Sequence, residues 1–201
     1  MNKMSRRTFI KSAIGTVALS SAPFKLKANW QDEKLPPIEN FDLIYDKNFT
    51  SSLDFVNILK GKTESIHEIA GDINTSLYNS LNDGFTKNKT TLIGIGSAES
   101  LFILEKIAND KGMRVIFKSS HELLKDGTIL HSFDASYPVL RTLTKEFSNS
   151  KDSDWVKILA DVLQTIPNQK IGSMDSFTSI SKDKYELNKP IHTWVIAPKI
   201  S

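Results

Sequence analysis

The 201-residue chain contains no cysteine. It therefore has no disulfide, no thiolate nucleophile and no zinc or iron–sulfur site held by cysteines. The apolar stretch near its N-terminus, residues 13–22, is well short of the roughly 20 residues that a membrane-spanning helix needs. Because disulfides are absent, stability must come from packing. A chain of this length can bury a sizeable core as one domain.

The basic balance of the chain comes from its first 28 residues. Lys and Arg number 26 against 23 Asp and Glu, which gives a formal net charge of +3. Residues 1–28 hold six of the basic residues and no acidic one, so the rest has 20 basic residues and a net charge of −3. Because nucleic-acid binding requires a retained basic face, we expect no nucleic-acid partner.

A short motif, Ser5-Arg6-Arg7-Thr8-Phe9-Ile10-Lys11, precedes the apolar stretch. Basic residues that precede an apolar stretch are typical of a secretory signal. In an amphipathic helix packed on a domain, the charges would be spread along the segment. The motif resembles the signal peptides of the bacterial twin-arginine translocation (Tat) route, and the match is carried by Ser5, Arg6, Arg7, Phe9, Ile10 and Lys11. This resemblance implies export of the folded chain to the periplasm, with the Tat translocase as partner and only transient membrane contact.

The signal peptide is predicted to cover residues 1–28, with its cleavage point left open. Pro23 disfavours cleavage directly after Ala22, and Ala28 is the next candidate. Residues 29–40, which include Pro36-Pro37, are predicted to be an extended lead-in. Residues 41–201 then form a single α/β domain.

Strand-like and helix-like segments alternate from residue 41 onward. Strands are predicted at 41–46, 65–70, 90–96 and 113–118, and the β-branched run at 90–96 suits a strand buried on both faces. Because a strand–helix–strand crossover makes neighbouring strands parallel, the pattern predicts an open, mostly parallel sheet of five or six strands. Helices are expected on both faces of this sheet.

Capping signals predict where the helices begin and end. Helix starts are predicted at Ser51, Asn74, Ser97 and Asp154, and helix ends at Gly61, Gly84, Gly112 and Pro167. The apolar residues of 97–110 share one arc, with Phe102 on the polar side. Beyond these, we predict a strand at 127–133, a helix at 137–147, an irregular segment at 168–190 and a closing strand at 192–197.

Open α/β sheets bind ligands beyond the carboxyl ends of their strands. The residues placed there form a candidate ligand rim of Asp46, Asp72, Gly94, Gly96, Ser97 and His121. These residue types are also ordinary in turns and N-caps, so both interpretations stay open. The loop at 94–99 lies where a dinucleotide would bind, but Glu99 replaces its last glycine and would oppose a pyrophosphate. No cofactor is assigned.

No catalytic motif is complete in this sequence. The Gly-x-Ser-x-Gly elbow of serine hydrolases is absent, and His67, His121, His131 and His192 are too scattered for a local metal motif. We predict no metal site, and His121, near Asp46 or Asp72, would be the first ligand to test.

The chain from Asp42 to His121 also resembles small uncharacterised proteobacterial proteins that carry Tat signals. The segments that carry this resemblance are 42–46, 71–73, 93–95 and 101–108. It implies a single exported domain and no particular activity.

The sequence leaves three functions open. The preferred one is a periplasmic protein that binds a small polar ligand or a partner protein at the candidate rim. The alternative is a hydrolase or transferase that uses the strand-end carboxylates and His121 as acid and base. The third is an escort of a larger Tat-exported enzyme, which should expose a large apolar patch.

Overall fold

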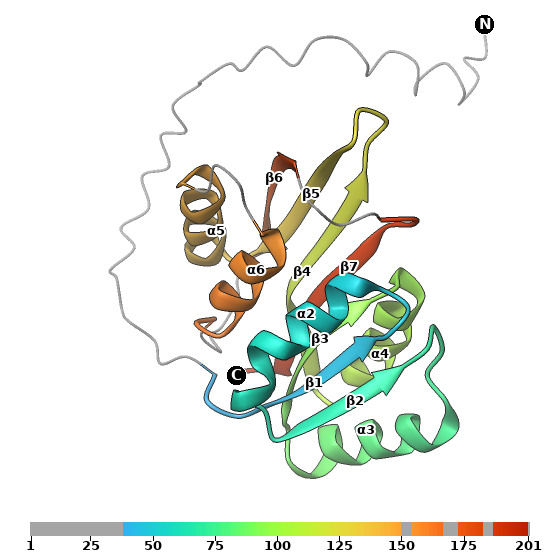
Figure 1. Cartoon of the computed structure of the whole chain (residues 1–201). Helices are drawn as coiled ribbons and strands as arrows, with labels where there is room; N and C mark the ends of the chain where they lie inside the picture. Colours follow the sequence, from blue (N-terminus) through green and yellow to red (C-terminus); the bar gives the residue numbers. More distant parts are fainter. Residues whose placement is uncertain (1–37, 150–153, 167–172, 183–186, 201) are drawn as a thin grey trace, which may run out of the picture. The chain divides into compact units, whose positions relative to one another are not determined.

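A computed structural model describes residues 38–149, 154–166, 173–182 and 187–200. The twin-arginine motif and the cleavage region lie outside the described residues. The described chain forms one seven-stranded sheet in the order β2-β1-β3-β7-β4-β5-β6 (Figure 1). Its strands are β1 (Phe41–Asp46), β2 (Ser65–Ile69), β3 (Thr91–Gly96), β4 (Met113–Leu123), β5 (Thr128–Ala135), β6 (Asp175–Lys182) and β7 (Ile191–Pro198).

The predicted open α/β sheet is confirmed, but in the described residues it is mixed and has seven strands, so the finer prediction of a mostly parallel sheet of five or six strands is wrong. β1 pairs in parallel with β2 and β3, whereas the β3–β7, β7–β4, β4–β5 and β5–β6 pairs are antiparallel. The error arises because the C-terminal strand β7 inserts between β3 and β4: Trp194 is the register partner of both Gly94 and Lys118. β3 and β4 point the same way but are not neighbours.

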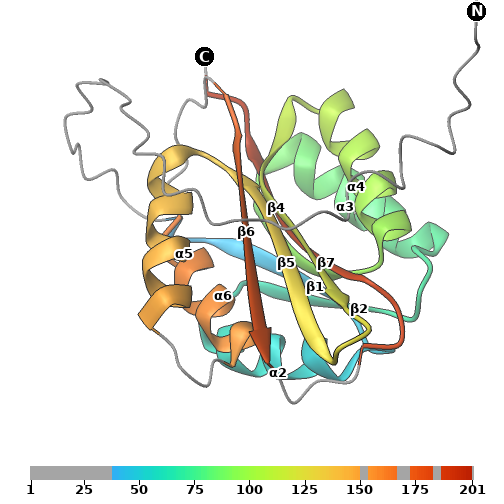
Figure 2. The same ribbon diagram turned by 90° about the horizontal axis from the view of Figure 1, so that it is seen from above.

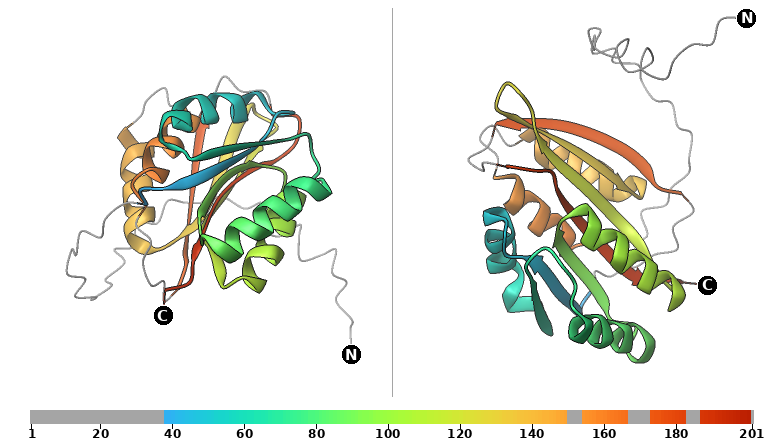
Figure 3. Two further views of the ribbon diagram at one scale, coloured as in Figure 1. Left: turned by 90° about the horizontal axis from the view of Figure 1, so that it is seen from below. Right: turned by 90° about the vertical axis from the view of Figure 1, so that its right-hand side faces the viewer.

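Helices cover both faces of the sheet, as predicted (Figure 2). One face carries α2 (Thr50–Leu59), α5 (Tyr137–Asn149) and α6 (Trp155–Leu163), and the other carries α3 (Thr75–Lys87) and α4 (Ala98–Asp110). We call the apolar layers beneath them the first core, which includes Phe55 and Leu159, and the second core, which includes Leu104 and Trp194. The second face is covered only in part: α3 and α4 lie over the half of the sheet that holds β1 and β3 (Figure 3), and Ile180 of β6 is 62% exposed.

Several local predictions are confirmed. Every residue of β3 is buried. Asn74 caps α3 by accepting a hydrogen bond from Leu77 N at 2.9 Å, and Asp154 caps α6 by accepting one from Lys157 N. Phe102 is 60% exposed on the outer side of α4. Each of these features is indicated by residues that lie close together in the sequence, so a local sequence pattern predicts it.

Other helix ends differ from the prediction. α2 begins at Thr50 with Phe49 as an N-cap that makes no side-chain hydrogen bond, so Ser51 is not the cap. The chain passes Gly61 in a 3₁₀ turn, η1 (Lys60–Lys62), and Gly84 lies inside α3 rather than at its end. A glycine typically ends a helix by adopting a positive φ, and at neither position does the backbone do so.

The edge strand β6 lies within the segment that the sequence predicts to be irregular. Its sequence, DSFTSISK, is mostly polar and mostly exposed, with Phe177 half-buried on the first core. A sheet edge that is open to solvent accepts such polar side chains. The strand therefore lacks the apolar run by which the central strands are recognised.

Candidate functional site

Part of the predicted rim comes together at the carboxyl edge of the parallel strands. Asp46 ends β1 and Gly96 ends β3, and a Cβ placed at Gly96 would lie 3.2 Å from Asp46 Cβ. Ser97 caps α4, where its Oγ accepts a hydrogen bond from Ser100 N at 3.2 Å. Asp72 follows β2 in an exposed turn. Asp46, Gly96 and Ser97 are therefore neighbours, as the strand-end rule predicts.

The rim is closed rather than open at its centre. Asp46 is 0% exposed; its Oδ1 accepts a hydrogen bond from Asn48 N, and its Oδ2 has no hydrogen-bond partner among the described residues. A Cβ at Gly94 would lie 2.2 Å from Trp194 Cε2. Only glycine fits at position 94, because the indole ring of Trp194 packs against the backbone where a side chain would begin. That ring, and not a ligand, occupies the space above Gly94.

His121 does not lie on the rim. It is 0% exposed and stacks on Trp155 of α6, with ring centroids 4.1 Å apart, so it faces the first core. Asp46 faces the other way, toward Trp194 in the second core. The expectation that His121 joins Asp46 and Asp72 at one edge is corrected accordingly.

His121 instead belongs to a buried hydrogen-bonded chain that crosses three strands. Its Nε2 lies 2.9 Å from Ser119 Oγ, and its Nδ1 lies 2.7 Å from His131 Nδ1. His131 Nε2 lies 2.8 Å from Ser181 Oγ on β6. We call this set, Ser119, His121, His131 and Ser181, the histidine chain. Because one Nδ1 must donate to the other, at least the accepting imidazole is neutral in this arrangement.

Burial explains why these histidines stay neutral. Desolvation lowers the pKa of His131 from 6.5 to about 4. It lowers the pKa of His121 well below its usual value, with further lowering from His131 and His192. His192 itself, on β7, has a pKa lowered mainly by burial. A fully enclosed neutral pair of this kind is a structural element of the core.

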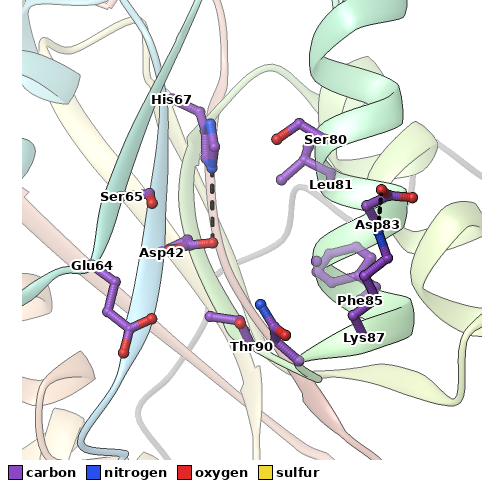
Figure 4. Close-up of a pocket in the computed structure, with 12 residues that line it drawn as sticks. Asp42, Glu64, Ser65, His67, Ser80, Leu81, Asp83, Phe85, Lys87 and Thr90 are labelled. Carbon is purple, nitrogen blue, oxygen red and sulfur yellow. Dashed lines mark hydrogen bonds and ion pairs between the residues drawn. The ribbon is translucent and has the colours of Figure 1, made fainter.

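A cavity of about 300 Å³ lies at the opposite, amino-terminal end of β1, β2 and β3 (Figure 4). Asp42 is the second residue of β1, Ser65 opens β2, and Thr90 directly precedes β3. The facing wall is the helix α3. The lining residues are Asp42, Glu64, Ser65, His67, Ser80, Leu81, Asp83, Gly84, Phe85, Lys87, Asn88 and Thr90. We call this cavity the Asp42–His67 pocket.

Strand alternation places Asp42 and His67 in this pocket. Phe41 and Leu43 enter the first core, so Asp42 points to the other face, beneath α3. The parallel register sets His67 opposite Ile44, whose side chain shares the face of Asp42. His67 Nε2 lies 3.8 Å from Asp42 Oδ2, with 19% and 20% of the two side chains exposed. Figure 4 shows the pair facing α3.

The pocket carries more acid than base. Its acidic groups are Asp42, Glu64 and Asp83, and its basic groups are His67 and Lys87. Lys87 Nζ binds Asp83 Oδ2 at 2.8 Å, so these two neutralise each other. Asp42 and Glu64 are left with His67 as the single remaining basic group in the lining.

Sequence reasoning missed this pocket because the strand-end rule selects the other edge of the sheet. One signal was present: Asp42 is a lone acid that alternates with apolar residues at the start of a strand. Among the described residues, no group of three or more His, Asp and Glu side chains is placed to hold a metal ion.

Comparison of the chain with protein-family models, curated proteins and solved structures finds no match. In the part of the chain that the structure describes, no helix has the length and apolar composition that crossing a bilayer requires.

Proposed function

We propose that this protein is exported by the Tat route to the periplasm as a folded single domain, and that it binds a small polar ligand there. The ligand site is the Asp42–His67 pocket. The observation that carries the proposal is the cavity itself, which has a volume of about 300 Å³. On one side of it lie the half-buried Asp42 carboxylate and the His67 imidazole, and on the other side lies the helix α3. This volume is at the lower end for ligand sites, so the ligand is about as large as an amino acid.

Export rests on the twin-arginine motif of residues 5–11. The fold supports this part of the proposal in one respect. Two apolar cores, one on each face of the sheet, stabilise a chain that has no disulfide. Such a domain can fold before it reaches an oxidising compartment.

The other two hypotheses have less support. An acid–base site made of Asp46, Asp72 and His121 requires His121 at the rim, and His121 is enclosed in the first core. An escort requires a large apolar patch. The two most exposed large apolar side chains of the described residues, Ile180 and Phe102, come from the separate elements β6 and α4.

A pocket-filling variant tests the ligand site. Ser80 lines the cavity from α3, whereas its neighbour Asn79 does not; both residues are exposed. We expect Ser80→Phe to weaken binding of a small ligand at least about tenfold, because the ring occupies the ligand's space, and Asn79→Phe to leave it unchanged. The measurement is calorimetric titration with three four-carbon probes: 1,4-diaminobutane, 1,4-butanediol and succinate.

Two results would contradict the ligand site. One is that none of the three probes binds the wild-type protein. The other is that a probe binds and Ser80→Phe retains full affinity while its thermal stability matches that of Asn79→Phe.

A further inference from the structure

We infer that the ligand of the Asp42–His67 pocket is a small organic cation with ammonium-type donors, and that Asp42 binds its charge. This inference rests on the proposed function, because it assigns the chemistry of the ligand at that site. It follows from three features of the lining residues: a carboxylate that accepts no hydrogen bond from the described residues, more acidic than basic groups, and two apolar side chains at the base of the pocket.

The Asp42 carboxylate has acceptor capacity that the described residues do not use. An ionised carboxylate accepts several hydrogen bonds, yet no described residue donates one to Asp42, and the nearest basic group in the lining, His67 Nε2, lies 3.8 Å from Asp42 Oδ2. Only 20% of the side chain is exposed. A carboxylate that is partly withdrawn from water and lacks donors loses solvation free energy, which a bound ammonium group restores.

The charge balance of the pocket favours a cation over an anion. Lys87 is held by Asp83, and both side chains are more than half exposed. An anionic ligand would therefore lie beside Asp42 and Glu64 with only His67 to attract it. A neutral polyol would supply hydrogen bonds but would leave the excess of acidic over basic groups in the lining unchanged. A cation satisfies the hydrogen bonds and the charge together.

The wall of the pocket also fits a short methylene chain. Leu81 and Phe85 of α3 lie at the base of the lining, and because only 3% and 2% of these residues is exposed they add a narrow apolar surface to a pocket that is mostly polar. Ser80 and Thr90 add hydroxyl oxygens that accept hydrogen bonds from an ammonium group. A compact aliphatic amine matches this combination of one acidic and one apolar side.

The same four-carbon series tests the charge preference. We expect 1,4-diaminobutane to bind the wild-type protein at least about tenfold more tightly than 1,4-butanediol, and succinate to bind more weakly than either. Asp42→Asn keeps the shape and removes the charge, so it should erase the preference for the amine. The matched control is Asp161→Asn on α6, which removes a 52% exposed carboxylate on the other face of the sheet and should change nothing.

Salt provides a second measurement that needs no variant. Raising the NaCl concentration should weaken binding of the diamine and leave binding of the diol unchanged, because only the charged contact is screened. A wild-type protein that prefers the diol or succinate, or an amine affinity that is insensitive to both salt and Asp42→Asn, would overturn the cation assignment. If the preferred probe is still blocked by Ser80→Phe, the proposed ligand site stands and only its chemistry is wrong. If no probe is blocked by Ser80→Phe, the site itself fails.

Discussion

Acidification from pH 6.5 to pH 4 should lower the free energy of unfolding by about 3 kcal/mol through His131 alone. In the unfolded chain a histidine binds a proton below about pH 6.5. In the folded protein burial delays protonation of His131 until about pH 4. The unfolded state therefore binds more protons across this window, and the stability that is fully present above pH 6.5 is lost as the pH falls.

His121 acts in the same direction, because burial also lowers its pKa. Protonating both rings in addition breaks the Nδ1–Nδ1 hydrogen bond, since two protonated imidazoles have no acceptor to offer. Trp155, Phe133 and Phe147 enclose the pair with aromatic rings. These rings carry no counter-charge that would ease protonation.

Urea unfolding at several pH values measures this loss. The interval from pH 6.5 to 5 is the most informative, because it lies above the usual titration range of carboxylates. The double variant His121→Gln/His131→Gln should show a clearly shallower slope of unfolding free energy against pH, with a remainder from His192, whose pKa is also lowered. A wild-type free energy that is constant across the interval would show that the two imidazoles are not buried as described.

Replacing Arg6 and Arg7 by lysine should leave the protein in the cytoplasm. The Tat pattern calls for two arginines, and lysine lacks the planar, bidentate guanidinium group. The net charge of the N-terminal region is unchanged, so loss of export would follow from the guanidinium groups and not from charge. The measurement is the distribution of the protein between cytoplasmic and periplasmic fractions.

The matched control for export is Lys3→Arg, which also preserves charge but lies before the motif. It should be exported like the wild-type protein. A double-lysine variant that reaches the periplasm in undiminished amount would contradict assignment to the Tat route.

Elements whose signals are local were predictable from the sequence. The β-branched run of β3, the single apolar arc of α4 and the Asp154 cap of α6 each depend on residues within one or two turns of chain. Strand order is a different kind of property. The placement of β7 between β3 and β4 depends on pairings across about 75 to 100 residues of chain, as with Trp194 opposite Lys118 and Gly94, and no local pattern encodes it.

The histidine chain and the Asp42–His67 pocket also depend on strand pairing, which the sequence does not reveal. His121 and His131 become partners only through the antiparallel β4–β5 register, which sets them directly opposite each other. Asp42 and His67 meet only because β1 and β2 are parallel neighbours. The strand-end rule identifies Asp46, Gly96 and Ser97, which do lie together, because that rule depends on strand direction alone. It says nothing of the amino-terminal edge, where the Asp42–His67 pocket lies.

The most direct test of the ligand site is an amide NMR titration of the protein with 1,4-diaminobutane. We expect saturable chemical-shift changes to concentrate on Asp42, Ser65 and His67 and on the stretch of α3 from Ser80 to Phe85. Changes concentrated instead on Asp46, Gly96 and Ser97, or scattered without saturation, would contradict a ligand site in the Asp42–His67 pocket.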